Sequence, residues 1–314
     1  MVPALGTLTH MSITLLDKGR AGLAKAVRDR IAGSDFENIH ARIWYTPGER
    51  WFTESDAIWR VHADTSMFIG GIRALLLQSL HPVAMLAVSE HSGFRGDPWG
   101  RLQRTSKFLA TTTYGCVADA EQSIRVVQAI HKRVTGQTPD GMPYKADDAR
   151  LLGWIHLAEV DSFLASYQTF GASTLEAEEA DQYVRQSGFV AQKLGVLDPP
   201  QSVAELQDLL DGYRPDLAIS AAAKEAADML LKDPPLSGPG RIGYAVLAAG
   251  AISILPSWAR AELSLPTLPV ADRLVVRPLA RSAMTTLRWA LTGDAPHESG
   301  SADGSARPRG DVGA

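Results

Sequence analysis

The chain has 314 residues, of which 45% are hydrophobic and 21% are charged. This composition can bury enough apolar surface to fold, which excludes a disordered protein. The net charge of −4 lacks the basic excess of a general nucleic-acid binder. A single cysteine, Cys116, excludes an internal disulfide framework and a thiolate-rich zinc or iron–sulfur site.

Residues 1–30 carry no visible targeting signal, because they lack an early basic run, an unbroken apolar core and a small-residue cleavage site. The two most apolar segments are 74–88, which contains His81 and Pro82, and 244–256, which is short. A membrane-spanning helix needs about 20 mostly apolar residues, so neither segment qualifies. We therefore expect a soluble, cytoplasmic protein.

Apolar residues recur with helical periodicity along most of the chain, and alternating strand-like runs are scarce. A core helix is expected over 66–91, with a break near Pro82. Asp97 as N-cap and Pro98 as first helical residue predict the start of the next helix, which runs to about Thr113. The helix after that is expected over 119–135, closed by Gly136 as a left-handed cap.

The rest of the chain continues the helical pattern. Ser173 and Glu176 have the spacing of a capping box. The sequence predicts an all-α fold in one globular domain over residues 1–292, and a disordered tail over 293–314, which lack apolar periodicity. The further expected helices are 147–170, 173–194, 202–213, 215–231, 241–254, 256–263 and 269–291.

Histidine spacing gives no local sign of a metal site. No carboxylate stands three residues before His62, His81, His131 or His156, so the Glu-x-x-His pairs of a di-iron bundle are missing. The chain has no His-x-x-x-His pair either. His156 and Glu159 reverse the order and can share one helix face. His81, beside Pro82, is interpreted as a structural residue that satisfies carbonyls freed by the proline.

His131 lies in an apolar stripe that it shares with Ile124, Val127 and Val134 at spacings of three and four. One interpretation is a buried neutral histidine. The other is an axial haem ligand, which needs a neutral imidazole in an apolar slot. Lys132 and Arg133 can then pair with haem propionates, or they can simply favour the end of a helix.

Arg101, Arg104 and Thr105 share one face of the helix that begins at Asp97 and Pro98. Guanidinium and hydroxyl groups projecting together can orient an anion, a bound water or dioxygen. The alternative is a solvated helix face with a few basic residues.

These residues belong to a set of motifs by which the chain resembles the rubber oxygenase catalytic-domain family. That family takes in latex clearing proteins, a fungal oxygenase of the mycophenolic acid pathway and many uncharacterised actinobacterial proteins. The resemblance spans about 43–263. It rests on Arg60-Val-His62, Gly70-Gly71-Ile-Arg73, Gln78-Ser-Leu-His81-Pro82, Ser89-Glu90-His91-Ser92, Asp97-Pro98-Trp-Gly100-Arg101-Leu-Gln-Arg104-Thr105, His131-Lys-Arg-Val134-Thr-Gly136, Tyr144, Trp154-Ile-His156, Asp161-Ser162 and Trp258-Ala-Arg260.

The resemblance implies a globin-like core with added helices and one b-type haem bound through a single histidine, here His131. It implies distal groups at Arg101, Arg104 and Thr105. Latex clearing proteins have lysine where this chain has Arg104, and arginine stays protonated, so iron ligation from that position is not expected. Glu90 is the candidate for the distal glutamate of that branch. The secretion signal of the rubber-cleaving members is absent.

The leading hypothesis is therefore a haem b-dependent oxygenase that acts with dioxygen on an apolar small molecule. His131 ligates the iron, Arg133 contacts the haem, and Arg101, Arg104, Thr105 and Glu90 act at the distal side. A second hypothesis is a non-haem iron or other metal hydroxylase with dispersed ligands. Its ligands would be His81, His91, His156 and Glu159. A third is a non-catalytic haem or lipid-binding protein. The sequence does not identify the substrate, redox partner or oligomeric state.

Overall fold

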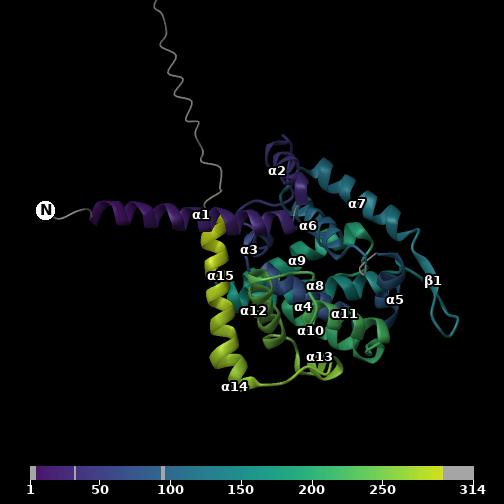
Figure 1. The fold of residues 1–314 in the computed structure, drawn as a ribbon. Helices are drawn as coiled ribbons and strands as arrows, with labels where there is room; N and C mark the ends of the chain where they lie inside the picture. The colour runs from purple at the N-terminus through teal and green to yellow at the C-terminus, as the bar shows by residue number, and fades with distance from the viewer. Residues whose placement is uncertain (1–4, 32, 93–95, 293–314) are drawn as a thin grey trace, which may run out of the picture.

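The computed structural model describes residues 5–31, 33–92 and 96–292, and within them helices make up nearly all regular structure (Figure 1). The predicted all-α, single-domain fold is confirmed, while the globin-like arrangement of its core stays a prediction. The predicted tail, 293–314, lies outside the described residues. The helices are α1 Leu5–Ile31, α2 Phe36–Tyr45, α3 Ala57–Ala63, α4 Met67–Gln78, α5 Pro82–His91, α6 Pro98–Tyr114, α7 Val117–His131, α8 Ala149–Phe170, α9 Ala177–Leu194, α10 Val203–Gly212, α11 Ala221–Leu231, α12 Pro239–Ser253, α13 Ser257–Glu262, α14 Pro269–Ala271 and α15 Arg277–Leu291. Two short strands, β1 Thr135–Gln137 and β2 Pro143–Lys145, pair antiparallel.

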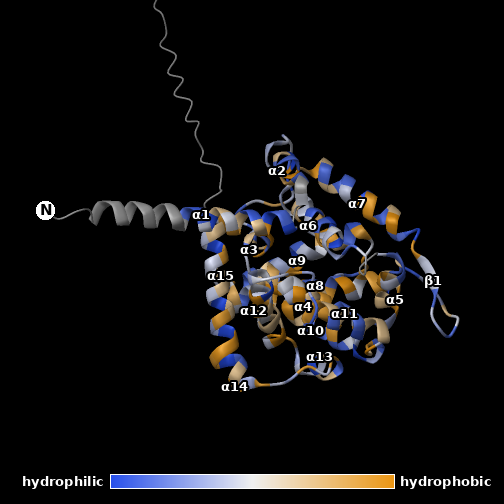
Figure 2. Ribbon diagram, in the orientation of Figure 1, coloured by the Kyte–Doolittle hydropathy of each residue, from blue (hydrophilic) through white to orange (hydrophobic). Residues whose placement is uncertain are grey.

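The core is built around α4 and α8, which pack together at the centre of the molecule, where the ribbon is most hydrophobic (Figure 2). Gly70 makes this close packing possible. A Cβ at Gly70 would lie 2.7 Å from Cδ1 of Phe163 and 3.3 Å from the carbonyl oxygen of Ser162. Trp154 and Phe170 of α8 are fully buried in the same core. The long apolar runs of these helices are therefore explained by burial on nearly all sides.

A buried ion pair crosses this core. Nη2 of Arg73 on α4 lies 2.7 Å from Oδ2 of Asp161 on α8, and both side chains are almost closed to solvent. Arg73 also donates to the Ser162 hydroxyl and to the carbonyl of Ile254, while Gln207 donates to Asp161. Because a buried charge is tolerated only when paired and hydrogen-bonded, this network ties α4, α8 and α10 to the segment after α12.

The expected break near Pro82 is confirmed, and it is a sharp corner: α4 and α5 are bent by 107°. Pro82 is the first residue of α5, and Nδ1 of His81 accepts from the backbone N–H of Ala84. His81 is therefore structural, as interpreted. It accepts a hydrogen bond from a backbone N–H, however, whereas the sequence predicted that it would donate to carbonyls freed by the proline. Among the described residues, no single helix is long and apolar enough to cross a membrane, and only the bent pair α4–α5 meets both criteria together.

Helix starts with a local cap were predicted well. Asp97 caps α6, accepting from the N–H of Gly100 at 2.8 Å, and Ser202 caps α10 in the same way. The predicted capping box of α9 lies three residues too early, because Glu176 and Glu179 form the box and Ser173 does not. The expected helix 215–231 begins only at Ala221, after a 3₁₀ turn at Arg214–Asp216.

The predicted end of α7 is wrong. The helix stops at His131, and Gly136 is an extended residue of β1 rather than a left-handed cap. Gly136 pairs with Tyr144 of β2, and a Cβ at Gly136 would lie within 2.7 Å of the tyrosine ring. Glycine is required here for a close approach, which a cap-based interpretation does not detect.

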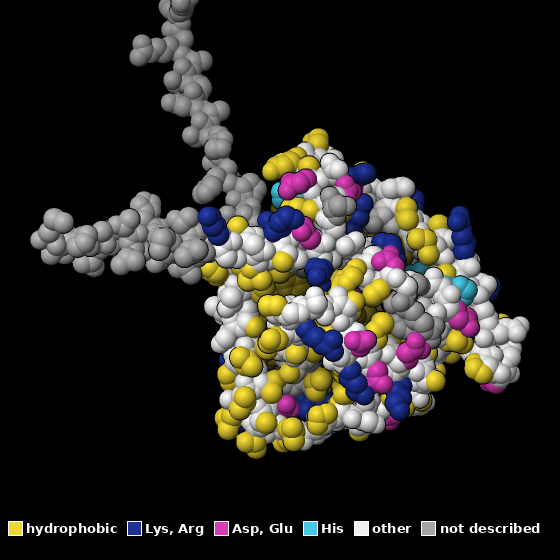
Figure 3. Space-filling view, viewed as in Figure 1, with side chains coloured by type: hydrophobic (Ala, Val, Ile, Leu, Met, Phe, Trp, Pro, Cys, Tyr) yellow, Lys and Arg dark blue, Asp and Glu magenta, His cyan; other side chains and the backbone are white. Residues whose placement is uncertain are grey.

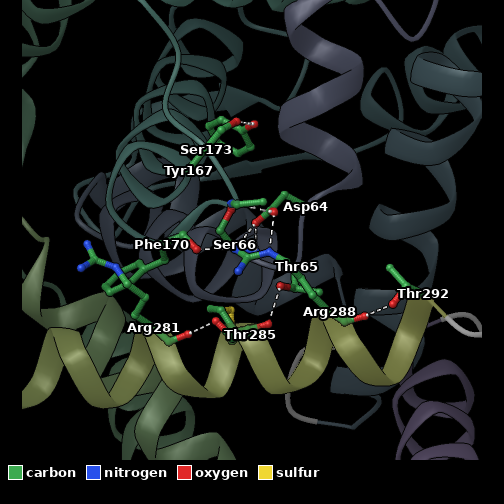
Figure 4. A network of polar contacts seen from close by, with 12 residues as sticks. Asp64, Thr65, Ser66, Tyr167, Phe170, Ser173, Arg281, Thr285, Arg288 and Thr292 are labelled. Carbon is green, nitrogen blue, oxygen red and sulfur yellow. Dashed lines mark hydrogen bonds and ion pairs between the residues drawn. The ribbon is translucent and has the colours of Figure 1, made fainter.

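The C-terminal helix α15 is held to the body by Asp64, at the corner between α3 and α4 (Figure 4). Arg288 donates to both carboxylate oxygens of Asp64 at 2.7 and 2.8 Å and also to the carbonyl of Phe170. Asp64 accepts in addition from the backbone N–H groups of Ser66 and Ala172. One buried carboxylate thus joins α15, the α3–α4 corner and the end of α8.

At its start, α15 continues α14 through a π-helical turn, Asp272–Val276, so the expected helix 269–291 is nearly continuous. Asp272 is buried in an ion pair with Arg260 at 2.7 Å. Aliphatic side chains gather on the outside of this corner (Figure 3), and the exposed ones include Leu268, Val270, Leu274, Val275 and Leu279. Ala280 and Met284, on the opposite face, are fully buried.

Candidate functional site

The candidate site lies at one end of the hairpin formed by α6 and α7. The two helices pack together and are joined by only Gly115 and Cys116. Such a short connection makes them run antiparallel, so the start of α6 and the end of α7 lie at the same end. This connection puts the Arg101 segment and His131 at the same end of the α6–α7 hairpin.

Of the three predicted side chains on α6, Arg101 is the one directed into the fold. It is half-buried, and its Nη1 donates to the hydroxyl of Ser92 at 3.1 Å. Burial, with a smaller contribution from Arg104, lowers the pKa of Arg101. Arg104 is exposed and lies 3.4 Å from the Asp97 carboxylate, and Thr105 is exposed one turn after Arg101. The predicted shared face is therefore divided between an inward guanidinium and two outer groups.

His131 is the last residue of α7 and is half-buried. Burial lowers the pKa of its imidazole, opposed only by the charge of Asp147, so the ring is neutral at neutral pH. No hydrogen bond to this ring occurs within the described part of the chain. Of its expected stripe, Ile124 is buried and Val127 half-buried, while Val134 lies beyond the helix. Arg133 is exposed just past the helix end.

Glu90, the predicted distal carboxylate, is exposed near the end of α5, where Oε2 accepts from the hydroxyl of Tyr144 at 2.6 Å. Burial and this carboxylate raise the pKa of Tyr144 to about 12, so the tyrosine keeps its proton and donates it to the bond. Because Tyr144 pairs with Gly136, just after α7, the bond ties the end of α5 to the end of α7.

The end of α5 thus makes one bond to α6, through Ser92 to Arg101, and one to β2, through Glu90 to Tyr144. These contacts hold Arg101 and Glu90 near the end of α5, and Tyr144 pairs with Gly136, five residues after His131. A neutral imidazole can ligate a metal, and a partly desolvated guanidinium can stabilise negative charge that develops on oxygen.

The dispersed metal site of the second hypothesis has no such geometry. In the part of the chain that the structure describes, no three histidine, cysteine or carboxylate side chains are grouped to hold a metal ion. His81 caps α5, and His91 is exposed with its Nε2 3.8 Å from Glu90. His156 and Glu159 do lie one turn apart on α8, as expected from their spacing.

The sequence did not reveal a second group of titratable side chains, deep between α3, α6, α8 and α9. Nδ1 of His62 lies 2.9 Å from Oγ1 of Thr113, and its ring is 5.9 Å from that of Tyr183. Burial lowers the pKa of His62 and of His156 to about 4 and raises that of Glu159 to about 7. The only sequence signals were the isolated pair His156 and Glu159 and the resemblance motif containing His62.

A family model described as the ER-bound oxygenase mpaB/B'/rubber oxygenase catalytic domain matches residues 59–289. The chain belongs to this family. The resemblance inferred from the motifs is confirmed, although the matched region both begins and ends later than 43–263. No curated protein and no solved structure matches the chain.

Membership in the mpaB/rubber oxygenase family supports an oxygenase activity for this chain. The matched region includes α5, α6 and α7, and with them all the candidate residues: Glu90, Arg101, Arg104, Thr105, His131 and Arg133. It also includes the buried group on α3, α8 and α9. The family match and the geometry therefore concern the same part of the molecule.

Proposed function

We propose that this protein is a haem b-dependent oxygenase that acts with dioxygen on an apolar small molecule, and that His131 would bind the iron. The observation that carries the proposal is the state of His131. The imidazole is half-buried and makes no hydrogen bond among the described residues, and burial lowers its pKa, which favours the neutral ring. A histidine ligand must offer such an unprotonated nitrogen.

His131, Arg101 and Arg133 carry the kinds of groups that would hold a haem. When bound, haem b would supply the iron that activates dioxygen. Arg101, held by Ser92 at the start of α6, keeps a guanidinium available to donate hydrogen bonds to an anionic oxygen. Arg133 is exposed two residues after His131, where its guanidinium would be able to pair with a haem propionate.

The apolar substrate class is supported by the family description, which includes rubber oxygenases. Glu90 and Thr105 are placed at the outer side of the site, where the Tyr144 hydroxyl orients the Glu90 carboxylate. In this arrangement Arg101 is the group that stabilises charge, and Glu90 is a positioning residue that fixes the end of α5 to β2.

One observation favours a non-catalytic haem protein as the second candidate. Arg104 is turned to Asp97, the Glu90 carboxylate is bonded to Tyr144 and Arg101 donates to Ser92. Three of the four predicted distal groups therefore have other partners. Oxygen consumption by the haem-loaded protein with a series of apolar alkenes and lipids separates the two candidates. Consumption that depends on substrate and on Arg101 supports the oxygenase, and haem binding without consumption supports the second candidate.

The test of the ligand is a set of histidine variants, purified and titrated with haem. His131→Ala should fold, as judged by circular dichroism, but retain little haem. His91→Ala, the matched control, removes an exposed histidine at the end of α5 and should keep haem. Arg101→Ala should keep haem and lose turnover. Full haem retention by His131→Ala would overturn the assignment.

A further inference from the structure

The buried titratable group between α3, α8 and α9 takes no part in the proposed haem site. Glu159 and Phe163 lie one turn apart on α8, and the ring of Phe163 is 5.7 Å from that of His62 on α3. The ring of His62 also contacts Tyr183 of α9. The charge of Glu159 helps to raise the pKa of the Tyr183 hydroxyl. Three helices therefore bring a carboxyl, a phenol and an imidazole to one place in the interior.

Several polar atoms of this region have no protein partner. Tyr183 is completely buried, and its hydroxyl makes no hydrogen bond. Ser187, one turn further along α9, is also buried. Its hydroxyl lies close enough to lower the pKa of Tyr183, although no hydrogen bond of ordinary geometry joins the two. Nε2 of His156, one turn before Glu159, is likewise buried without a partner. Buried polar groups nearly always have partners, so these atoms point to a ligand that supplies hydrogen bonds.

The charges of the region define what that ligand can be. No lysine or arginine of the described residues pairs with Glu159, and burial alone raises the pKa of its carboxyl. The imidazoles of His62 and His156 are neutral because burial lowers their pKa values. Asp161, whose charge also acts on Tyr183, is already paired with Arg73. A site of neutral donors and acceptors with no fixed countercharge suits water, which can donate and accept at once.

We propose that Glu159, Tyr183 and Ser187 form an interior water-binding site between α8 and α9, in which Glu159 stores one exchangeable proton. In each exchange the O–H bond of the Glu159 carboxyl breaks as an O–H bond to the water forms, so only a proton moves. His62 borders the site and bonds to Thr113, which places the stored proton beside α6, the helix that also carries Arg101. This inference does not depend on haem binding.

The test is an infrared titration of the protein as purified, following the C=O stretching band of protonated carboxyl groups through the neutral pH range. The wild-type protein should show a band that disappears as pH rises through about 7. Glu159→Gln should lack this band. Glu121→Gln, which removes an exposed carboxylate on α7, should keep it.

The Tyr183→Phe variant tests whether the Tyr183 hydroxyl binds water or has no hydrogen-bond partner at all. If the hydroxyl binds water that also contacts Glu159, its loss should shift the midpoint of the Glu159 band, and a crystal structure of the wild-type protein should show ordered water between the two side chains. A Tyr183→Phe variant with an unchanged midpoint and a higher melting temperature would overturn the proposal, because removing an unpaired hydroxyl stabilises a fold. So would the absence of any carboxyl band that depends on Glu159.

Discussion

Replacing Glu159 by glutamine should change how stability depends on pH. Burial raises the pKa of this carboxyl from 4.5 to about 7 in the folded protein. The folded state therefore binds the proton more tightly than the unfolded state. The stability that this proton contributes is complete below pH 4.5 and is lost as pH rises to 7 and above.

The size of this loss follows from the two pKa values. Each pH unit between them is worth about 1.4 kcal/mol, so the wild-type protein should lose on the order of 3 kcal/mol of unfolding free energy between pH 4.5 and pH 8 through this group. Glutamine has nearly the same volume and cannot ionise. The unfolding free energy of Glu159→Gln, relative to the wild-type protein, should therefore rise by that amount over the same range.

Urea denaturation at half-unit pH intervals from 4.5 to 8, followed by circular dichroism, measures the difference. All other groups titrate in both proteins and cancel in the comparison. Glu121→Gln serves as the control, since its carboxylate is exposed, and its difference from the wild-type protein should stay nearly constant with pH. A constant difference for Glu159→Gln as well would refute the burial of an unpaired carboxyl at this position.

Three further predictions concern packing and the polar contacts of the fold. Gly70→Ala should destabilise the protein by about 1–3 kcal/mol because its Cβ would meet Phe163. Gly71→Ala, with open space around it, should instead stabilise α4 by about 0.5–1 kcal/mol; equal effects in thermal unfolding would contradict this account. Asp64→Ala leaves Arg288 unpaired and should cost about 3–5 kcal/mol in urea unfolding, and a loss below 1 kcal/mol would show that α15 is held otherwise. Tyr144→Phe removes the bond to Glu90 and should cost about 1 kcal/mol, with faster hydrogen exchange at the end of α5; unchanged exchange would contradict the tie to β2.

Much of the fold could be predicted because its signals are local. Asp97 and Pro98 start α6 by capping and by a preset φ, and both depend on neighbouring residues only. Pro82 forces a corner between α4 and α5 for the same kind of reason. Helix ends that depend on distant partners were missed. Gly136 resembles a cap in sequence, but Tyr144 determines its structure from eight residues further along the chain.

The candidate site divides in the same way. Arg101 and Thr105 could be placed on one helix and His131 on the next, because spacing determines helix faces. The two-residue connection that makes the helices antiparallel is known only from the structure, since the sequence predicted a longer one. The bond from Tyr144 to Glu90 could not be predicted, since it joins a strand that the periodicity does not show. Nor could the surroundings of Glu159, because the missing countercharge is a property of three packed helices.

The measurement that tests the central claim most directly is an absorption spectrum of the freshly purified protein with a pyridine haemochrome assay on the same sample. The account predicts a Soret band and one b-type haem for each chain, with the band lost in His131→Ala and retained in His91→Ala. A protein that binds no haem even after reconstitution, or a His131→Ala variant with an unchanged spectrum, would contradict the claim that α7 carries the axial ligand.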